Sequence, residues 1–143
     1  MSELSISAIP ANLINQVWGQ VKPLLERVTE KAPDVVSVYA VRERLYAGST
    51  VLVTISEGDT IVAINTLTVE TLDSGMKVLF IPITAGDRMD EWLERFLDVA
   101  RDIARDHGCE ELRGLSVRKG WMRVLKEHGW AESHVIIKCK VEV

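Results

Sequence analysis

Residues 76–108 constrain the fold most, because they predict a strand, a short loop and a long helix in succession. Residues 77–83 form a nearly unbroken apolar run rich in β-branched and aromatic side chains, which predicts a central strand covered on both faces. Asp90 is placed to cap the following helix, and Gly108 is placed to end it in a left-handed conformation. One face of this helix is apolar. It carries Trp92, Leu93, Phe96, Leu97, Ala100, Ile103 and Ala104.

Composition is that of an ordinary folded protein. With 143 residues, 47% apolar and 27% charged, we expect a single domain spanning residues 1–143 with a substantial core. The net charge of -4 disfavours a dedicated nucleic-acid binder, which needs a basic face. A basic cluster near the C-terminus keeps a weaker nucleic-acid hypothesis open, but a solvated helix face explains it more simply. The cluster is Arg113, Arg118, Lys119, Arg123 and Lys126.

Cysteine usage and hydropathy indicate the compartment. Cys109 and Cys139 form no CxxC pair, so we predict no metal site, and unpaired thiols fit a reducing compartment. The N-terminus lacks the apolar core of a signal peptide, and no apolar run approaches the roughly 18 residues of a membrane span. We therefore expect a cytoplasmic protein with no membrane partner, or one packed into a virion assembled in the cytoplasm.

Two helices are predicted before the first strand. Ser7 and Pro10 are typical of a helix start, and an apolar stripe at offsets of four and three residues follows. Pro23 predicts a kink or a break near Lys22. A second helix is predicted over residues 35–47 with Asp34 as its cap, although residues 35–39 could equally form a strand. The stripe of the first helix is Ile14, Trp18, Val21, Leu25 and Val28.

The remaining elements complete a mixed sheet. Residues 50–56, 60–70 and 77–83 predict an antiparallel meander, and a crossover helix makes residues 110–117 parallel to the third strand. After a short helix over residues 120–128, the alternation in residues 134–143 predicts a final strand that buries Cys139 as a small apolar residue. The order ααβββαβαβ is an α/β fold with helices on both faces of the sheet. The last strand could also pair with a neighbour's sheet edge, which leaves a homodimer open.

This order, with the segments 108–113 (GCEELR) and 120–130 (GWMRVLKEHGW), resembles the GNAT superfamily of N-acetyltransferases. The likeness covers residues 50–143 best, and it is greatest to small GNAT-like proteins of bacteriophages. It implies that acetyl-CoA lies where strands 77–83 and 110–117 part, with its pantetheine arm paired to backbone and its pyrophosphate on the N-terminus of the long helix. Pro82 fits either a strand leaving its neighbour or a simple bulge. The resemblance assigns cofactor contacts to Ile81, Ile83, Gly86, Arg88 and Arg118.

The sequence departs from the family pattern at the loop and at the acid. The family's glycine-rich loop keeps only Gly86 here, and Asp87 and Asp90 add negative charge where phosphates would lie, although Arg88 offsets part of it. The family's proton-donating tyrosine falls on Leu125, which cannot donate a proton. Arg118 takes the place of a family asparagine. The nearest candidates for a general base are Glu70, His128 and His134.

Each of the two main base candidates also has a structural interpretation. His128 precedes a helix-ending glycine and is typical of a partner for a helix C-terminus, while Glu70 is typical of a charge at a turn edge. Two functions follow. The first is an acetyl-CoA-dependent N-acyltransferase with weak or absent catalysis, acting on a protein or small-molecule amine. The alternative is a non-catalytic phage structural or host-interaction protein that has lost the CoA site.

Overall fold

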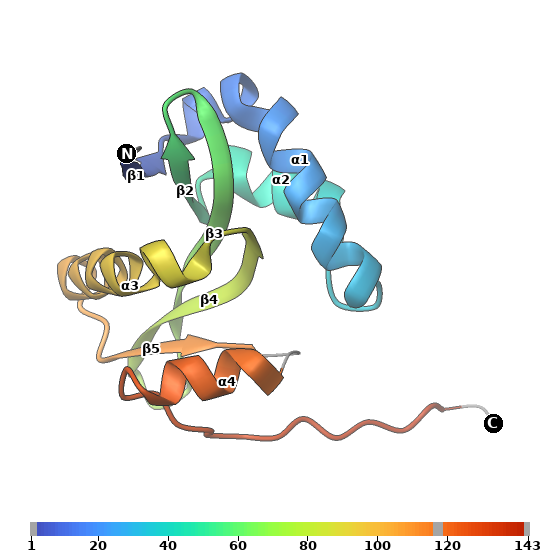
Figure 1. The fold of residues 1–143 in the computed structure, drawn as a ribbon. Helices are drawn as coiled ribbons and strands as arrows, with labels where there is room; N and C mark the ends of the chain where they lie inside the picture. Colours follow the sequence, from blue (N-terminus) through green and yellow to red (C-terminus); the bar gives the residue numbers. More distant parts are fainter. Residues whose placement is uncertain (1–2, 116–118, 142–143) are drawn as a thin grey trace.

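The computed structural model describes residues 3–115 and 119–141 and has an α/β architecture (Figure 1). A strand precedes two helices, a three-stranded meander follows, and a strand and two further helices complete the fold. The elements in chain order are β1 Leu4–Ile9, a 3-10 turn at Ala11–Leu13, α1 Ile14–Lys31, α2 Val38–Ala47, β2 Val51–Glu57, β3 Thr60–Thr71, β4 Lys77–Gly86, α3 Met89–Asp106, β5 Glu111–Gly114 and α4 Lys119–Lys126.

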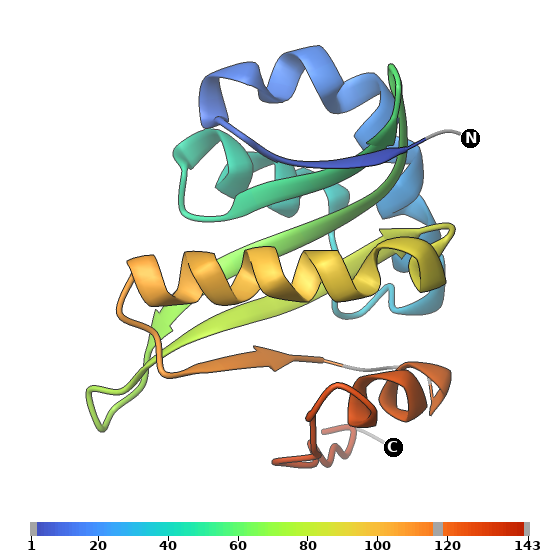
Figure 2. The same ribbon diagram turned by 60° about the vertical axis from the view of Figure 1, so that its left-hand side comes forward.

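The sheet has the strand order β1-β2-β3-β4-β5. The first four strands are antiparallel to their neighbours, whereas β4 and β5 are parallel and are joined by the α3 crossover (Figure 2). The predicted α/β fold, the meander and the parallel fourth pairing are therefore confirmed. β5 is shorter than the predicted strand over residues 110–117, and residues 116–117 of that prediction lie outside the described residues.

Two apolar cores lie on opposite faces of the sheet, with α3 on one face and α1 and α2 on the other (Figure 1). In the α3 core, Trp92 and Phe96 meet edge to face, with ring centroids 5.9 Å apart. In the other core, Val21 and Leu25 of α1 are fully buried. β4 contributes to both cores, which confirms the central strand predicted from its unbroken apolar run.

The N-terminal segment is a strand, and the predicted helix start at Ser7 is wrong. Ser7 pairs with Thr54 in an antiparallel ladder between β1 and β2, and Leu4 is buried in the α3 core. The sequence signal failed because a serine followed by a proline suits a helix start as well as the end of a short edge strand. Helix α1 then runs through Pro23 without a break, so of the two predicted alternatives only a kink near Lys22 stays a prediction.

Helix α2 begins later than predicted, and its cap is Ser37 rather than Asp34. The Ser37 hydroxyl accepts a hydrogen bond from the backbone N–H of Ala40 at 3.2 Å. The alternative of a strand at residues 35–39 is wrong, because residue 35 lies in a turn and residues 38–39 already belong to the helix. Val41 and Leu45 of this helix are buried in the α1–α2 core. Asp34 lies in the turn that precedes the helix.

The predicted final strand is absent over residues 134–141, and residues 142–143 lie outside the described part of the chain. Cys139 is exposed there, so the prediction that it is buried is wrong. Alternation gives a segment strand propensity, but a strand also needs a partner edge, and this segment pairs with none of the described strands. The described helices include none that is both long and apolar enough to span a membrane.

Candidate functional site

The parallel ladder between β4 and β5 stops halfway along β4. Its pairs run from Val78 with Glu111 to Ile81 with Gly114. β4 continues to Gly86, and over residues 83–86 it pairs only with β3 among the described strands. Figure 2 shows β4 continuing past the end of β5. Over these last residues, one edge of β4 therefore presents backbone N–H and C=O groups that none of the described strands pairs with.

A β-bulge coincides with the end of this ladder. On β3, Thr66 pairs with Ile83 and Thr68 with Phe80. Between these two pairs β4 therefore contains one residue more than β3. The side chains change face as a result: Ile81 packs in the α3 core and Ile83 in the α1–α2 core. Pro82 lies between them and has no N–H to donate. The bulge interpretation of Pro82 is therefore confirmed, and the ladder with β5 ends one residue before this proline.

Position 86 requires a glycine because its backbone lies against the backbone of β3. Its φ is 126°, and a Cβ atom placed on it would lie 2.4 Å from the carbonyl oxygen of Val62 and 2.5 Å from Cα of Ala63. The next residue, Asp87, donates its N–H to the same Val62 carbonyl at 3.0 Å. Packing of the loop on β3 is therefore sufficient to explain this glycine, which the resemblance assigns to the phosphate loop.

Helix α3 starts two residues earlier than expected, and the predicted Asp90 cap is wrong. The residue at the cap position is Arg88, held in the left-handed region at φ 62° and ψ 32°, without a side-chain capping bond. Asp90 lies inside the first turn, and the indole N–H of Trp92 donates to the Asp87 carbonyl at 2.9 Å. The first backbone N–H groups of α3 have no partner within the helix, so this terminus, which follows β4 directly, favours anions.

Acidic side chains surround this terminus. Arg88 donates to Glu91 at 2.7 and 3.0 Å and to Glu57 at 2.8 Å, while Arg27 bonds to both carboxylate oxygens of Asp87 at 3.2 Å. The bonds to Glu91 and then Glu57 raise the pKa of Arg88, and Arg88 in turn lowers the pKa of Glu91. Three carboxylates are thus paired with two guanidinium groups, and Asp90 adds a fourth carboxylate in the first turn of α3. A phosphate would therefore have to compete with carboxylates for Arg88.

The predicted site residues divide into two groups. Ile81, Ile83, Gly86 and Arg88 follow one another along β4 and into α3, and both isoleucines are buried. Arg118 lies outside the described residues. Leu125, at the position of the family's tyrosine, is buried.

The candidate bases lie elsewhere in the fold. Glu70 is exposed and pairs with Val78, three residues before the ladder ends, which is about 10 Å back along the strand. His128 follows α4, where its backbone N–H donates to the Leu125 carbonyl at 2.9 Å. His134 is exposed, and its ring nitrogen Nδ1 lies 2.8 Å from the Ser133 hydroxyl. The register of β3 therefore keeps Glu70 away from the end of the ladder.

A partly buried polar pair that joins β3 to the last residues of β4 was not predicted. The Thr84 hydroxyl donates to Oδ1 of Asn65 at 2.7 Å, and Asn65 is fully buried on β3. The other side-chain atom of this amide, Nδ2, has no hydrogen-bond partner among the described residues. A lone asparagine inside the apolar run of β3 was the available sequence signal.

Other site features are sparse. A shallow hollow of about 420 Å³ is lined by Met122, Arg123, Lys126 and Glu132, and none of these residues belongs to β4 or α3. Within the described part of the chain, no three His, Cys, Asp or Glu side chains are grouped as metal ligands. The end of the β4–β5 ladder is therefore the feature with the clearest binding chemistry: an extended ligand can replace β5 as partner of β4, and an anion can lie at the start of α3.

No family model and no curated protein matches the sequence. Solved structures do match. An aminoglycoside acetyltransferase from an uncultured soil metagenomic sample, in complex with sisomicin, has a TM-score of 0.72 at 15% identity, covering 96% of this chain and 95% of its own. An aminoglycoside N-acetyltransferase AAC(6')-Iy in complex with CoA has a TM-score of 0.70 at 14% identity, and the match covers 100% of this chain and 97% of the other. Glucosamine-6-phosphate N-acetyltransferase from Arabidopsis thaliana has a TM-score of 0.68 at 14% identity, and the match covers 98% of this chain and 99% of the other. At such low identity these matches show the GNAT acetyltransferase fold.

Proposed function

We propose that this protein binds an acyl-CoA along the unpaired edge of β4 and transfers the acyl group to an amine. The observation that carries the proposal is the end of the parallel ladder at Ile81 and Gly114, followed by a further stretch of β4 that leads directly into α3. The pantetheine arm is extended and contains amides, so it can pair with β4 as a strand would. The structurally similar AAC(6')-Iy enzyme was crystallised with CoA, which supports this choice of ligand.

Within this proposal, the backbone around Ile81 and Ile83 pairs with the pantetheine arm. The pyrophosphate lies over Gly86 and the first turn of α3, where the helix N-terminus attracts anions. Arg88 contacts a phosphate after exchanging one of its carboxylate partners for the ligand, and Arg118 is a second candidate phosphate contact. Because Glu57 and Glu91 already bind Arg88 at 2.7–3.0 Å, we expect weaker binding than a glycine-rich loop would give.

The proposed chemistry is direct attack on a thioester. The amine lone pair forms the new C–N bond, the C–S bond breaks, CoA leaves as a thiolate, and the attacking nitrogen loses a proton. The buried Leu125 cannot protonate the thiolate, so catalysis relies on positioning more than on acid–base groups. Glu70 and His128 remain candidate bases, and Glu70 would need a longer reach because of its place in the β3 register.

The acceptor is proposed only as a class. The similar structures include an enzyme bound to sisomicin, one named for glucosamine-6-phosphate and one named for a ribosomal-protein alanine. Their named substrates and ligands cover both small-molecule amines and protein amines. We therefore propose an amine acceptor, of either the small-molecule or the protein kind.

Calorimetric and thermal titration with acetyl-CoA tests the proposal. A ligand at about 100 times its dissociation constant stabilises the folded state by about 2.7 kcal/mol, which corresponds to a rise in Tm of roughly 5–10 °C for a chain of this size. Arg88→Asn should weaken binding, because asparagine tolerates the left-handed backbone but cannot hold a phosphate as arginine does. Arg105→Asn, which removes the arginine of another ion pair on α3, should leave binding unchanged. No shift at millimolar acetyl-CoA would exclude CoA binding.

The second candidate is a non-catalytic protein that keeps the fold without the cofactor, in the manner of a phage structural or host-interaction protein. The carboxylates at the start of α3 favour it, because four of them lie where the pyrophosphate would bind. This candidate predicts no stabilisation by acetyl-CoA and no release of CoA thiol in the presence of any amine.

A further inference from the structure

One arginine on the surface of α2 is held by aromatic rings. Figure 1 shows α2 beside α1 on one face of the sheet. The guanidinium carbon of Arg42 on α2 lies 5.1 Å from the ring centre of Trp18 on α1 and 5.2 Å from that of Tyr46 on α2. At these distances both rings attract the cation, so they fix its place between the two helices.

Hydrogen bonds hold the same guanidinium along one edge. Nε and Nη2 of Arg42 donate to the Tyr46 hydroxyl at 3.2 and 2.9 Å, and Nη2 also donates to Oδ1 of Asn15 at 3.5 Å. The Tyr46 hydroxyl in turn donates to the same Asn15 oxygen. Arg42 is half-buried, so its side chain is held in one orientation before any ligand binds.

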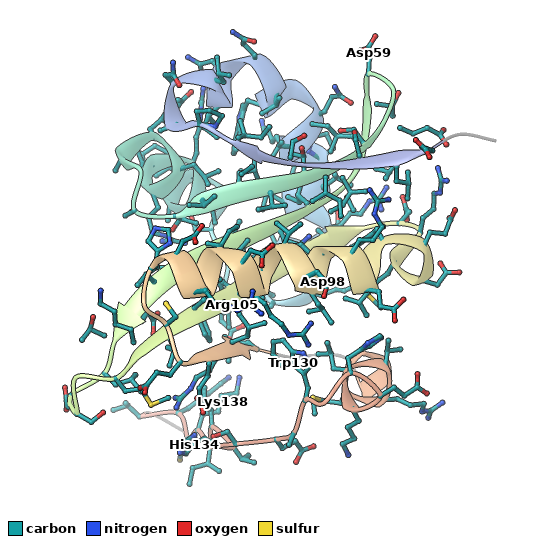
Figure 3. The ribbon with its side chains drawn as sticks, turned by 90° about the vertical axis from the view of Figure 1, so that its left-hand side faces the viewer. Asp59, Asp98, Arg105, Trp130, His134 and Lys138 are labelled. Carbon is teal, nitrogen blue, oxygen red and sulfur yellow. The ribbon has the colours of Figure 1, made fainter. Side chains whose placement is uncertain are left out.

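The remaining nitrogen, Nη1, donates to none of the residues that the structure describes, and none of their carboxylates is paired with Arg42. Five other arginines do have carboxylate partners, as Arg105 of α3 has in Asp102 (Figure 3). The five are Arg27, Arg88, Arg101, Arg105 and Arg113. Residues 11–21 carry no charged side chain, and Glu43, which follows Arg42, does not share its helix face. The positive charge of Arg42 is therefore not compensated locally.

Exposed aromatic surface continues from this arginine along α2. Tyr39 precedes Arg42 by three residues and Tyr46 follows it by four, so all three share one face of the helix. Tyr39 is 73% exposed and Tyr46 is 37% exposed. Tryptophan, tyrosine and arginine are the residues that most often supply the binding energy of protein interfaces. The Arg42 patch is defined as Asn15, Trp18, Tyr39, Arg42 and Tyr46.

We propose that the Arg42 patch docks an acidic segment of a partner protein. Nη1 of Arg42 donates to an aspartate or glutamate carboxylate of that segment, and the aromatic rings pack against apolar side chains beside the carboxylate. The hydrogen bond is charge-assisted and therefore stronger than one between neutral groups. Because the guanidinium is already held in place, little side-chain entropy is lost on binding.

Shape and charge favour a protein segment over other ligands. Small-molecule sites are concave, whereas Tyr39 projects into solvent and the face from Tyr39 to Tyr46 extends over about 10 Å of helix. A nucleic acid needs several cations for its phosphates, whereas this patch has one in uncharged surroundings. A single carboxylate flanked by apolar side chains matches both properties.

The patch is separate from the proposed acyl-CoA site. On α1, Trp18 precedes Arg27 by nine residues, which is about 13 Å of helix, and it is Arg27 that meets Asp87 near the start of α3. The inference therefore does not rest on CoA binding.

Selection from a random peptide library displayed on yeast tests the docking. The full chain is the bait, and clones that also bind the Arg42→Gln chain are removed, after circular dichroism has shown that this variant is folded. We expect the remaining peptides to share an aspartate or glutamate next to apolar residues. A set of peptides without a common carboxylate, or no peptide that distinguishes the two baits, overturns the inference.

Titration of one selected peptide, followed by fluorescence anisotropy, measures the pairing directly. Arg42→Gln should weaken binding about tenfold or more, because a hydrogen bond between charged groups is lost. Changing the peptide carboxylate to an amide should weaken binding to the wild type as much and leave binding to Arg42→Gln unchanged. Arg44→Gln, which removes the other arginine of α2, is the matched control and should bind as the wild type does. Additive losses from the two changes would overturn the inference.

Tyr39→Ala separates docking from a structural role of the patch. Tyr39 makes no hydrogen bond or ring contact with the described residues, so its removal should leave Tm unchanged. We expect it to weaken peptide binding several-fold, because its exposed ring supplies apolar contact. Full binding by Tyr39→Ala would show that the peptide does not lie on this face, and would overturn the inference even if Arg42→Gln proves unstable.

Discussion

At the scale of single residues, adding even one methyl group at Gly86 should lower the stability of the fold strongly. A methyl group there would meet the Val62 carbonyl at 2.4 Å, and its φ of 126° disfavours any side chain. We expect Gly86→Ala to lower the free energy of unfolding by about 2–4 kcal/mol, measured by urea denaturation. Gly75→Ala is the control, since its φ of 90° carries backbone strain but the site is open. Equal losses of unfolding free energy in Gly86→Ala and Gly75→Ala would contradict this prediction, because they would show that the backbone moves to relieve the clash.

Arg88 should make stability depend on pH in the acid range. Its hydrogen bonds lower the pKa of Glu91, so this carboxylate stabilises the fold above its unfolded pKa, and the contribution is lost as pH falls through the folded pKa. The stability difference between wild type and Arg88→Asn should therefore be larger at pH 7 than at pH 3. Urea titrations at both pH values measure it, with the exposed pair of Asp102 and Arg105 as reference. A difference independent of pH would contradict this role.

At the scale of secondary-structure elements, two residues compete as the N-terminal cap of helix α2. Ser37 makes the capping bond in the structure, whereas Asp34 is the cap that the sequence predicts. Ser37→Ala should cost about 1 kcal/mol of stability, because a first-turn N–H loses its acceptor. Asp34→Ala should cost much less, since its exposed ion pair with Lys138 at 3.5 Å contributes little. Chemical denaturation of both variants measures the two stability losses. A larger loss for Asp34→Ala than for Ser37→Ala would contradict the Ser37 cap.

At the scale of the whole molecule, both cores share one sheet. Leu25 packs in the α1–α2 core and Leu97 in the α3 core, and β4 contributes side chains to each. We therefore propose that the described chain unfolds as one unit. Leu25→Ala and Leu97→Ala should each lower stability by about 2–5 kcal/mol and keep one transition. Tryptophan fluorescence and far-ultraviolet circular dichroism should give the same midpoint; two separate transitions would indicate independently folding halves.

The ends of the chain show where prediction from sequence stops. The central elements were predicted correctly because their periodicity extends over many residues: the helical stripe of α3 and the apolar run of β4 each have one consistent structure. β1 was missed because Leu4–Ile9 is short and its pattern is weak. The prediction for residues 134–141 failed in the opposite way, because their alternating pattern is strong but they pair with none of the described strands.

The candidate site was predicted only in part. The resemblance placed Ile81, Gly86 and Arg88 along one strand and loop, and the structure keeps them together. The carboxylate partners of Arg88 could not be foreseen in full, because Glu57 comes from the β2–β3 hairpin and meets Arg88 only when the sheet forms. Neither could the Asn65–Thr84 pair, which depends on the register of two strands.

The sequence by itself determined the α/β class, the meander, the parallel crossover and the amphipathic faces of α1 and α3, because these follow from local periodicity and from the handedness of connections. Only the tertiary structure decided where the β4–β5 ladder ends, which carboxylates bind Arg88, and that residues 134–141 pair with none of the described strands. Those features depend on contacts between segments far apart in the chain. Local propensity contains no information about such contacts, since each segment has the same propensity whether or not a neighbour is present.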